Sequence, residues 1–299
     1  MTIKKIIGRF APTPSGNLHL GSLVAAVASF LDAKSRNGLW LLRIDDVDLP
    51  RAKADSVLNI LQSLDAFGFE WDGKVIYQSR HLKIYQDFLE MLRPFLFECH
   101  CTRQSLKNQK KASDGGIFYP GICRERKIVG ELNNKTIRFE VPNQTLIFND
   151  FLLGKCTQNL LDDCGDFVIK RRDNVFSYHL ATIVDDALSG VSHVVRGADL
   201  KNSTFRQILL QEVLKFKTPC YAHVPIVKNA NGEKLSKQTH ARPLNLKNPS
   251  KDLWCALKFL NQNPPVEIKN ESTVEIWNWA KKAWNLSAAS ANLWQSSEL

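Results

Sequence analysis

The feature that most constrains the fold is the alternation of short apolar runs with amphipathic segments at the start of the chain. Residues 3–10 and 39–44 have the length and apolar character of buried strands. Residues 18–35 and 55–67 place apolar side chains at the i, i+3, i+4, i+7 spacing of a helix. A strand, helix, strand, helix order predicts a parallel sheet covered by helices, so we expect an α/β fold.

This alternation stops and then returns further along the chain. Residues 82–97 are predicted as a third helix, and residues 98–129 carry cysteines, glycines and basic residues without periodicity. Residues 135–150 alternate in a way that predicts a hairpin, after which strands and helices alternate again. The pattern therefore indicates an insertion that divides one sheet.

Four segments follow from this pattern: the first half of an α/β domain, an inserted subdomain, the second half of the domain, and a helical C-terminal region. Their predicted bounds are 1–97, 98–150, 151–240 and 241–299. Five of the seven Trp residues lie in the last segment at helical spacing, which favours an aromatic core there over a Trp-based binding platform.

The charge balance limits the partners. A formal net charge of +10 and a pI of about 9.2 favour a polyanion, with nucleic acid ahead of an anionic membrane surface. No run approaches the roughly 18 to 20 apolar residues of a membrane helix. The odd number of cysteines, seven, argues against a secreted disulfide framework, so we expect reduced thiols and a cytoplasmic protein.

The most informative loop is Arg9-Phe-Ala-Pro-Thr-Pro-Ser-Gly-Asn-Leu-His-Leu-Gly-Ser22, which joins the first strand to the first helix. His19 and Gly21 stand at the helix start, where free backbone N–H groups and the helix dipole favour phosphate. Gly21 allows a flat adenine or ribose to approach the backbone. A His-x-Gly motif alone is weak, because many loops contain one.

A second loop, Gly232-Glu-Lys-Leu-Ser-Lys-Gln238, places Lys234 and Lys237 three residues apart. Two ammonium groups there would neutralise a triphosphate as pyrophosphate leaves. A solvated basic loop is the alternative interpretation of this motif.

Together the two loops resemble the HIGH-like and KMSKS-like signatures of class I aminoacyl-tRNA synthetases. Residues 9–22, 42–51 and 167–200 resemble the glutamyl-tRNA synthetase lineage, and the likeness runs over nearly all of residues 3–240. Within it, the chain is most similar to the shortened branch that attaches glutamate to the queuosine base of tRNA(Asp). The stretch after Lys237 is too short for the large anticodon-binding region of full-length glutamyl-tRNA synthetases.

The resemblance implies a Rossmann-like catalytic domain, an inserted zinc-containing acceptor-type subdomain, and activation of L-glutamate by ATP with Mg²⁺. It implies catalytic roles for His19, Lys234 and Lys237, and ATP contacts from His19, Gly21, Ser22 and Lys237. It places around the glutamate Arg9, Ala11, Ser15, Asp45, Tyr178 and Arg196. These residue types suit a dicarboxylic amino acid, which needs guanidinium groups for its carboxylates and an acid for its ammonium. Surface ion pairs are the alternative for the arginines.

Three positions depart from the lineage. Asp45 stands where the family usually has Glu, which leaves Asp46 as a second candidate for the ammonium contact. Ser22 replaces the second His of the HIGH pattern, and Gln238 replaces the final Ser of KMSKS. Both replacements are typical of the shortened branch, and they leave His19 as the one imidazole of the motif.

A metal site is predicted in the insertion. Cys99 and Cys101, followed by Cys123, offer three thiolates, and one further oxygen or nitrogen ligand would complete a tetrahedral structural site. Composition alone favours His100 as the fourth ligand, whereas the resemblance favours Tyr119 and one Zn²⁺ per chain. Three unligated buried cysteines are the alternative.

The expected partners are ATP, L-glutamate and tRNA(Asp) carrying queuosine, with no membrane, and the family expectation is a monomer. Basic residues in the insertion and the cluster Lys170, Arg171 and Arg172 are candidates for phosphate contacts. Two other functions fit the same residues: ordinary charging of tRNA(Glu) at its 3′ end, and RNA binding by a non-catalytic paralogue.

Overall fold

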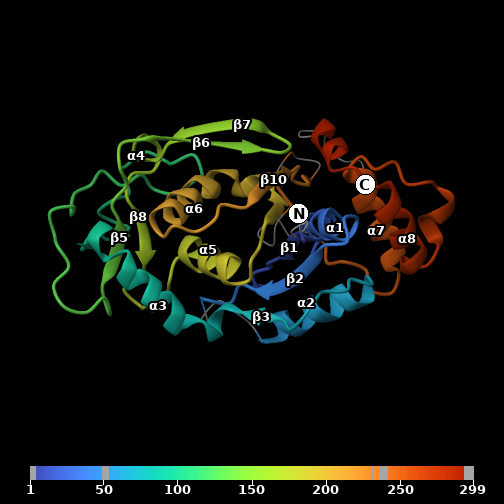
Figure 1. The fold of residues 1–299 in the computed structure, drawn as a ribbon, viewed down its shortest axis with the longest axis horizontal. Helices are drawn as coiled ribbons and strands as arrows, with labels where there is room; N and C mark the ends of the chain where they lie inside the picture. The colour runs from blue at the N-terminus through green and yellow to red at the C-terminus, as the bar shows by residue number, and fades with distance from the viewer. Residues whose placement is uncertain (1–4, 49–53, 230–231, 233, 236–241, 293–299) are drawn as a thin grey trace.

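The computed structural model describes residues 5–48, 54–229, 232, 234–235 and 242–292. Figure 1 shows their arrangement. In chain order the helices and strands are β1 (Ile7–Phe10), α1 (Leu20–Lys34), β2 (Leu39–Ile44), α2 (Ala54–Ala66), β3 (Ile76–Tyr77), η1 (Gln78–Arg80), α3 (Leu82–Met91), η2 (Arg93–Phe95), β4 (Leu96–Cys99), β5 (Thr136–Phe139), β6 (Thr145–Asp150), β7 (Gly154–Asn159), α4 (Leu160–Asp163), β8 (Phe167–Lys170), α5 (Tyr178–Leu188), β9 (His193–Gly197), η3 (Ala198–Leu200), α6 (Lys201–Val213), β10 (Cys220–Val224), α7 (Pro249–Phe259), η5 (Glu267–Asn270), α8 (Thr273–Ala283) and η6 (Leu286–Asn292).

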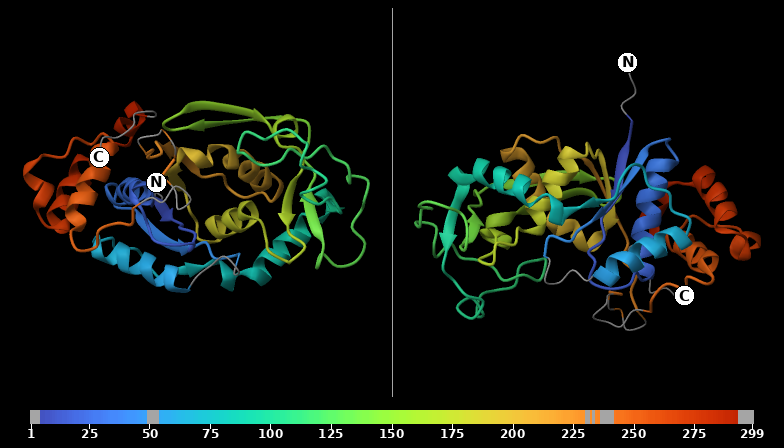
Figure 2. Two further views of the ribbon diagram at one scale, coloured as in Figure 1. Left: turned by 180° about the vertical axis from the view of Figure 1, so that it is seen from behind. Right: turned by 90° about the horizontal axis from the view of Figure 1, so that it is seen from below.

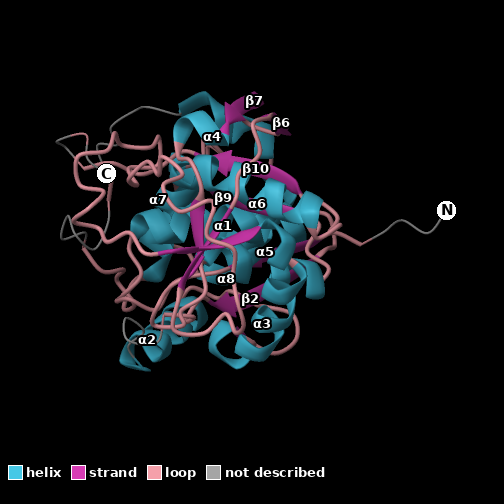
Figure 3. Ribbon diagram, turned by 90° about the vertical axis from the view of Figure 1, so that its left-hand side faces the viewer, coloured by secondary structure: helices cyan, strands magenta, loops and turns pink. Residues whose placement is uncertain are grey.

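The centre of the molecule contains two groups of parallel strands that lie far apart in the sequence. Strands β1, β2 and β3 pair in parallel, and so do β9 and β10. The two groups meet where the Ser192 N–H donates to the Ile7 carbonyl at 2.9 Å. Helix α1 packs against both β1 and β9, and Figure 3 shows α1, α5 and α6 gathered around β9 and β10. The expected insertion, residues 98–150, lies in the sequence between these two groups of strands, and its role as a separate subdomain stays a prediction.

The segment between the halves contains an antiparallel sheet in the order β4, β5, β8. The helix expected over residues 82–97 is too long, because α3 ends at Met91 and the chain continues through η2 into β4. Pro94 lies in η2, and its missing N–H and fixed ring do not permit the helix to continue.

The hairpin expected over residues 135–150 is wrong. Strand β5 pairs with β4 and β8, whereas β6 pairs with β7 through a turn at Gly154, where φ is +71°. Asp150 at the end of β6 also aligns with Tyr221 of β10. The alternation predicted the strands correctly but not their partners, because the strand that begins at residue 145 belongs to the sheet of β9 and β10 and not to that of β5.

The C-terminal helices share the core of the parallel sheet. The ring of Trp277 in α8 lies 4.7 Å from that of Phe30 in α1 and 5.0 Å from Phe69. Its Nε1–H donates to the Phe67 carbonyl at 2.8 Å. The expected aromatic core is confirmed, although Trp294 lies outside the described residues. Figures 1 and 2 show α7 and α8 at one end of the molecule and the antiparallel sheet at the other.

Among the described residues, no helix combines the length and the apolar character that crossing a membrane requires.

Candidate active site

A cleft of about 460 Å³ opens where β1, β9 and β10 end at their carboxyl edges. Ligands of open parallel α/β sheets bind at this edge. The cleft brings together most of the predicted site residues, which come from four separate parts of the chain: Arg9, Ala11, Ser15, His19, Gly21, Ser22, Tyr178, Arg196 and Lys234.

His19 caps the first helix. Its Nδ1 accepts a hydrogen bond from the Ser22 N–H at 3.3 Å, and its Nε2 lies 3.4 Å from the Ser22 hydroxyl oxygen. A Cβ on Gly21 would lie only 3.2 Å from two atoms of the His19 ring, so glycine lets the imidazole fold over the helix start. The His-x-Gly-Ser sequence therefore places an imidazole, a hydroxyl and helix N–H groups side by side.

Within the second loop, Lys234 and Leu235 line the cleft. The Leu235 N–H donates to the Val227 carbonyl at 2.9 Å, and the Lys234 ammonium lies 2.5 Å from the Asp199 carboxylate. Lys234 thus lies in the cleft as predicted. Lys237 and Gln238 lie outside the described residues.

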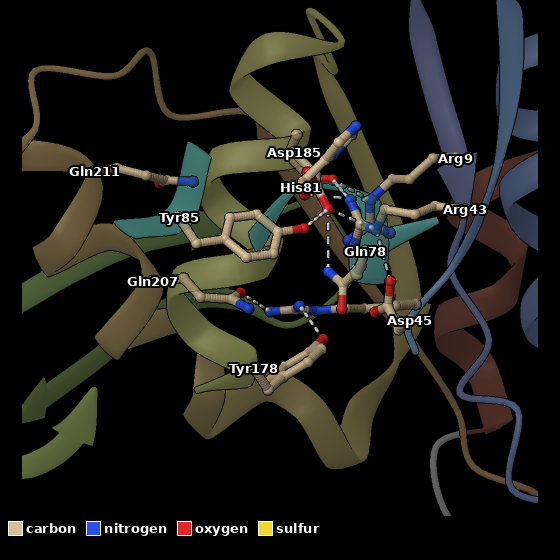
Figure 4. Close-up of polar contacts among 12 residues, drawn as sticks. Arg9, Arg43, Asp45, Gln78, His81, Tyr85, Tyr178, Asp185, Gln207 and Gln211 are labelled. Carbon is tan, nitrogen blue, oxygen red and sulfur yellow. Dashed lines mark hydrogen bonds and ion pairs between the residues drawn. The ribbon is translucent and has the colours of Figure 1, made fainter. Parts of the chain in front are cut away.

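One side of the cleft, which we call the β1 wall, consists of Arg9, which lines it, and the buried charge network behind Arg9, formed by Arg43, Asp45 and Asp186. Arg9 Nε lies 3.3 Å from Asp186, while Arg43 reaches Asp186 through Nη1 and Asp45 through Nε, both at 2.6 Å. Figure 4 shows Arg9, Arg43 and Asp45 within this network. Burial opposes ionisation of Asp186, but the charges of Arg9 and Arg43 lower the pKa of its carboxyl. Burial dominates at Asp45 and raises the pKa there, despite Arg43.

Asp45 lies beside the cleft and does not line it. It lines an adjoining cavity of about 360 Å³, to which Ser15 and Tyr178 of the cleft also contribute. Asp46, the second candidate, accepts hydrogen bonds from the Ser79 N–H at 2.8 Å and hydroxyl at 2.7 Å. Asp46 lines neither cavity.

A second buried carboxylate, Asp185, stands behind the β1 wall. It accepts from the Tyr85 hydroxyl at 2.7 Å and the Gln78 amide at 3.2 Å, and lies 2.7 Å from His81 Nδ1 (Figure 4). These contacts tie α5 to η1 and α3. Sequence reasoning missed Arg43, Asp185 and Asp186. Two adjacent aspartates inside the otherwise apolar helix α5 were the available signal.

The other side of the cleft, which we call the β9 wall, consists of Arg196 and Tyr178, which line it, with Thr204 and Gln207 in contact with Arg196 behind them. Arg196 donates to the Thr204 hydroxyl at 2.7 Å, the Gln207 amide oxygen at 2.8 Å and the Tyr178 hydroxyl at 3.3 Å. Figure 4 shows Gln207 and Tyr178 approaching from α6 and α5. No carboxylate in the described part of the chain contacts Arg196. Its charge is thus held by neutral acceptors and remains available to an anionic ligand.

Similarity to known proteins identifies the family. Residues 5–251 match the family described as tRNA synthetases class I (E and Q), catalytic domain. The Aromatoleum aromaticum protein named glutamyl-Q tRNA(Asp) synthetase is 48% identical over 94% of this chain and 89% of its own length. Its namesake in Dechloromonas aromatica is 45% identical, with 94% of each chain covered. The chain belongs to the glutamyl-Q tRNA(Asp) synthetase family. It is therefore a ligase of the aminoacyl-tRNA synthetase type.

Solved structures agree on the fold. A glutamate-tRNA synthetase from Elizabethkingia anophelis superposes with a TM-score of 0.76 at 23% identity, covering 96% of this chain and 67% of that one. A glutamate tRNA ligase from Elizabethkingia meningosepticum, in complex with its amino acid, gives the same score over 66% of its length. The synthetase fold is the Rossmann-like α/β arrangement described above.

In this family member the cysteines of the insertion form one cluster. The sulfur atoms of Cys99, Cys101 and Cys123 lie within 4.8 Å of one another, with 3.7 Å between Cys101 and Cys123. The Tyr119 hydroxyl lies 3.6 Å from Cys99 and accepts from the Cys123 N–H at 2.9 Å. His100 is directed elsewhere, to Glu98 at 3.0 Å.

The thiols of the cluster differ in how readily they ionise. Burial opposes ionisation of Cys123, but hydrogen bonds from Tyr119 and a backbone N–H lower its pKa to about 7. Burial and the contact with Cys123 raise the pKa of Cys101 to about 11. Arg138 donates to Cys99 at 3.2 Å and stacks 3.7 Å over the Tyr119 ring. Soft thiolate groups in this number and spacing fit Zn²⁺.

The basic cluster at residues 170–172 does not form one phosphate-binding face. Lys170 is buried and donates to Gln86 and Asn133, at 2.9 and 2.7 Å. Arg171 is paired with Asp48 and Asp173. Because Lys170 is buried and the partly exposed Arg171 is paired with two carboxylates, Arg172 is the best exposed candidate of the cluster for RNA contact.

Proposed function

We propose that this protein activates L-glutamate with ATP and transfers it to the queuosine base in the anticodon loop of tRNA(Asp). The observation that carries the proposal is the cleft, which joins a phosphate-binding helix start to a guanidinium held by neutral groups. Identity of 48% to a protein named for this reaction supports it. These features suit glutamyl adenylate, in which a phosphate joins the nucleoside to the glutamyl group and a free carboxylate lies at the end of the glutamyl side chain.

In the first step a glutamate carboxylate oxygen attacks the α-phosphorus of ATP, and the bond to pyrophosphate breaks. No side chain needs to act as nucleophile, so the protein contributes orientation and charge neutralisation. His19 and the first N–H groups of α1 hold the phosphates, Gly21 and Ser22 admit the nucleotide, and Lys234 with Lys237 stabilises the leaving group. ATP brings Mg²⁺, which shares this neutralisation.

Arg196 orients the glutamate side-chain carboxylate, with Tyr178 beside it. Arg9, Ala11 and Ser15 complete the pocket, and Asp45 in the adjoining cavity faces the ammonium group. In the second step a hydroxyl of the queuosine cyclopentenediol attacks the activated carbonyl, the ester forms, and AMP leaves.

We further propose that Cys99, Cys101, Tyr119 and Cys123 bind one structural Zn²⁺ per chain. A closed tetrahedral site would pin the turn carrying Cys123 to the end of β4. Protein purified without chelator should contain about one equivalent of zinc, and less than about half would overturn the site. Cys123→Ser should lose the metal, whereas Cys156→Ser, outside the cluster, should retain it.

The deciding experiment has two arms. Glutamate-dependent ATP–pyrophosphate exchange should occur, and its absence would favour a non-catalytic RNA-binding protein. Glutamate should then transfer to tRNA(Asp) containing queuosine and not to the same tRNA lacking it. Transfer to the 3′ end of tRNA(Glu) would favour ordinary charging. A cytoplasmic monomer remains our prediction.

A further inference from the structure

Arg196 is supported from behind by a buried pair of residues that no step above uses. Its Nε lies 3.2 Å from Nε2 of His223, and His223 Nδ1 lies 2.6 Å from Oδ2 of Asp150. The side chains of His223 and Asp150 are both 0% exposed. The three residues come from β9, β10 and the end of β6, so they form a line across the sheet into the cleft.

One arrangement of protons satisfies this line. Arginine only donates and an ionised carboxylate only accepts, so Nε2 of His223 carries the lone pair and Nδ1 carries the proton. The orientation of Asp150 is fixed as well, because its Oδ1 accepts from the backbone N–H groups of Leu152, Leu153 and His223 at 3.0, 3.0 and 3.2 Å. Only Oδ2 is left for the imidazole.

We propose that His223 and Asp150 are positioning residues, which hold the Arg196 guanidinium in the orientation that binds the substrate carboxylate. The inference rests on the proposed role of Arg196. With Nε bound to His223 and Nη2 bound to Thr204 and Gln207, the remaining nitrogen, Nη1, lies beside the Tyr178 hydroxyl that lines the cleft. The pair thereby selects which edge of the guanidinium meets the ligand.

The neutral imidazole that this role needs is the favoured form. Burial lowers the pKa of His223, and the nearby Arg196 charge acts in the same direction, against the hydrogen bond to Asp150. A protonated ring would turn its Nε2–H toward the Arg196 Nε–H, which is repulsive, and the Thr204 hydroxyl oxygen, 3.1 Å from Nε2, already accepts from Arg196 Nη2.

Asp150→Asn gives the sharpest test. The backbone N–H groups at Oδ1 require the amide oxygen there, so the amide NH₂ replaces Oδ2 and faces His223. The imidazole must then accept through Nδ1 and carry its proton on Nε2, opposite Arg196. We expect KM for glutamate in pyrophosphate exchange to rise roughly 10- to 100-fold, with kcat and KM for ATP within about twofold.

Two further variants separate positioning from general stability. His223→Gln places an amide oxygen near the Nε2 position and should retain glutamate KM within about threefold, whereas His223→Asn lacks that acceptor and should raise KM about tenfold. Tyr221→Phe is the matched control. Tyr221 lies on β10, the strand of His223, and the substitution removes its buried hydrogen bond with Gln211 of α6 while leaving the hydrogen bonds of Arg196 in place. It should leave glutamate KM unchanged.

The ring protons provide a readout apart from activity. ¹⁵N NMR of the imidazole should show Nδ1–H in the unaltered protein and Nε2–H in Asp150→Asn. If Arg196→Lys leaves glutamate KM unchanged, the proposed role of Arg196 fails. If Arg196→Lys raises KM but Asp150→Asn and His223→Asn do not, or if the tautomer does not change, positioning by His223 and Asp150 is overturned.

Discussion

The two arginines that end neighbouring strands of the sheet are equally buried but differently neutralised. Arg9 is 4% exposed and Arg196 is 5% exposed. In the β1 wall, Arg9 is paired with Asp186, which also accepts from Arg43. In the β9 wall, Arg196 contacts hydroxyl, amide and imidazole groups, and the nearest carboxylate of its line, Asp150, lies beyond His223.

This difference separates holding the fold from binding a ligand. A buried guanidinium paired with carboxylates is internally compensated, and removing one partner leaves a charge without solvent or counter-ion. A buried guanidinium among neutral acceptors has its hydrogen bonds satisfied, but its positive charge is not neutralised. An anion therefore binds it more strongly. We therefore expect substitutions in the β1 wall to alter stability first and those in the β9 wall to alter glutamate binding first.

The largest effect should follow removal of a carboxylate from the β1 wall. Asp186→Ala leaves Arg9 and Arg43 facing each other and should lower the free energy of unfolding by about 3 to 5 kcal/mol. Thr204→Val, which removes a neutral acceptor from the β9 wall, should cost only about 1 kcal/mol. Urea unfolding of the two variants measures the difference, and equal losses would contradict the comparison.

The reciprocal effect should be seen in binding. Arg196→Met should raise KM for glutamate by roughly 30- to 1,000-fold, because a charge-assisted contact to a carboxylate is lost. The thermal midpoint should fall less than in Arg9→Met, since no carboxylate loses its partner. Exchange kinetics together with thermal unfolding test this. A larger fall in the thermal midpoint for Arg196→Met than for Arg9→Met would show that the β9 wall, and not the β1 wall, stabilises the fold.

The pH dependence should distinguish two carboxylates within the β1 wall. A lowered pKa at Asp186 stabilises the fold above the unfolded value of 3.8, and this contribution is lost as pH falls below it. A raised pKa at Asp45 has the opposite sign, because its ionised form disfavours folding at neutral pH. Asp186→Asn should therefore destabilise more than Asp45→Asn at pH 7.

The difference between these two variants should shrink as the pH falls from 7 toward 3, because the stabilising charge of the native Asp186 carboxylate is lost as the pH falls through its lowered pKa. Urea midpoints measured at both pH values provide the check. A gap that stays constant with pH would show that hydrogen-bond geometry, and not charge, separates the two positions.

Much of the cleft was predictable because its residues lie in continuous motifs. The stretch from Arg9 to Ser22 crosses one strand end and one helix start, so its side chains reach one edge of the sheet without knowledge of the rest of the fold. Arg43 and Asp186 were missed because these two partners are 143 residues apart in the sequence, and a buried charged residue has no periodic pattern that would reveal it.

The failures of the fold prediction have a similar origin. Alternation predicted β5 and β6 correctly as strands, but strand partners depend on turns and long-range packing that a local pattern does not contain. The end of α3 was available from Pro94, whose effect on a helix is local. The family resemblance placed Asp45 around the glutamate, and the structure shows that Arg43 holds it in the adjoining cavity.

The smallest effect is expected at the ion pair of Lys234 and Asp199, which is more exposed than either wall. Their side chains are 47% and 28% exposed, so solvent screens the charges and the pair should contribute less than about 1 kcal/mol to stability. Asp199→Asn should leave the urea midpoint nearly unchanged. It should lower KM for ATP about two- to threefold, because the Lys234 ammonium no longer divides its charge between a carboxylate and the phosphates.

Ionic strength provides the control for this last prediction. The gain in ATP affinity from Asp199→Asn should diminish as salt is raised from about 0.05 to 0.5 M, since exposed charges interact over a shorter distance there. The glutamate KM effect of Arg196→Met should not change over the same range, because that side chain is buried. A salt-independent ATP effect at Asp199 would place Lys234 among the buried, preorganised charges and remove the distinction between a screened loop and the two walls.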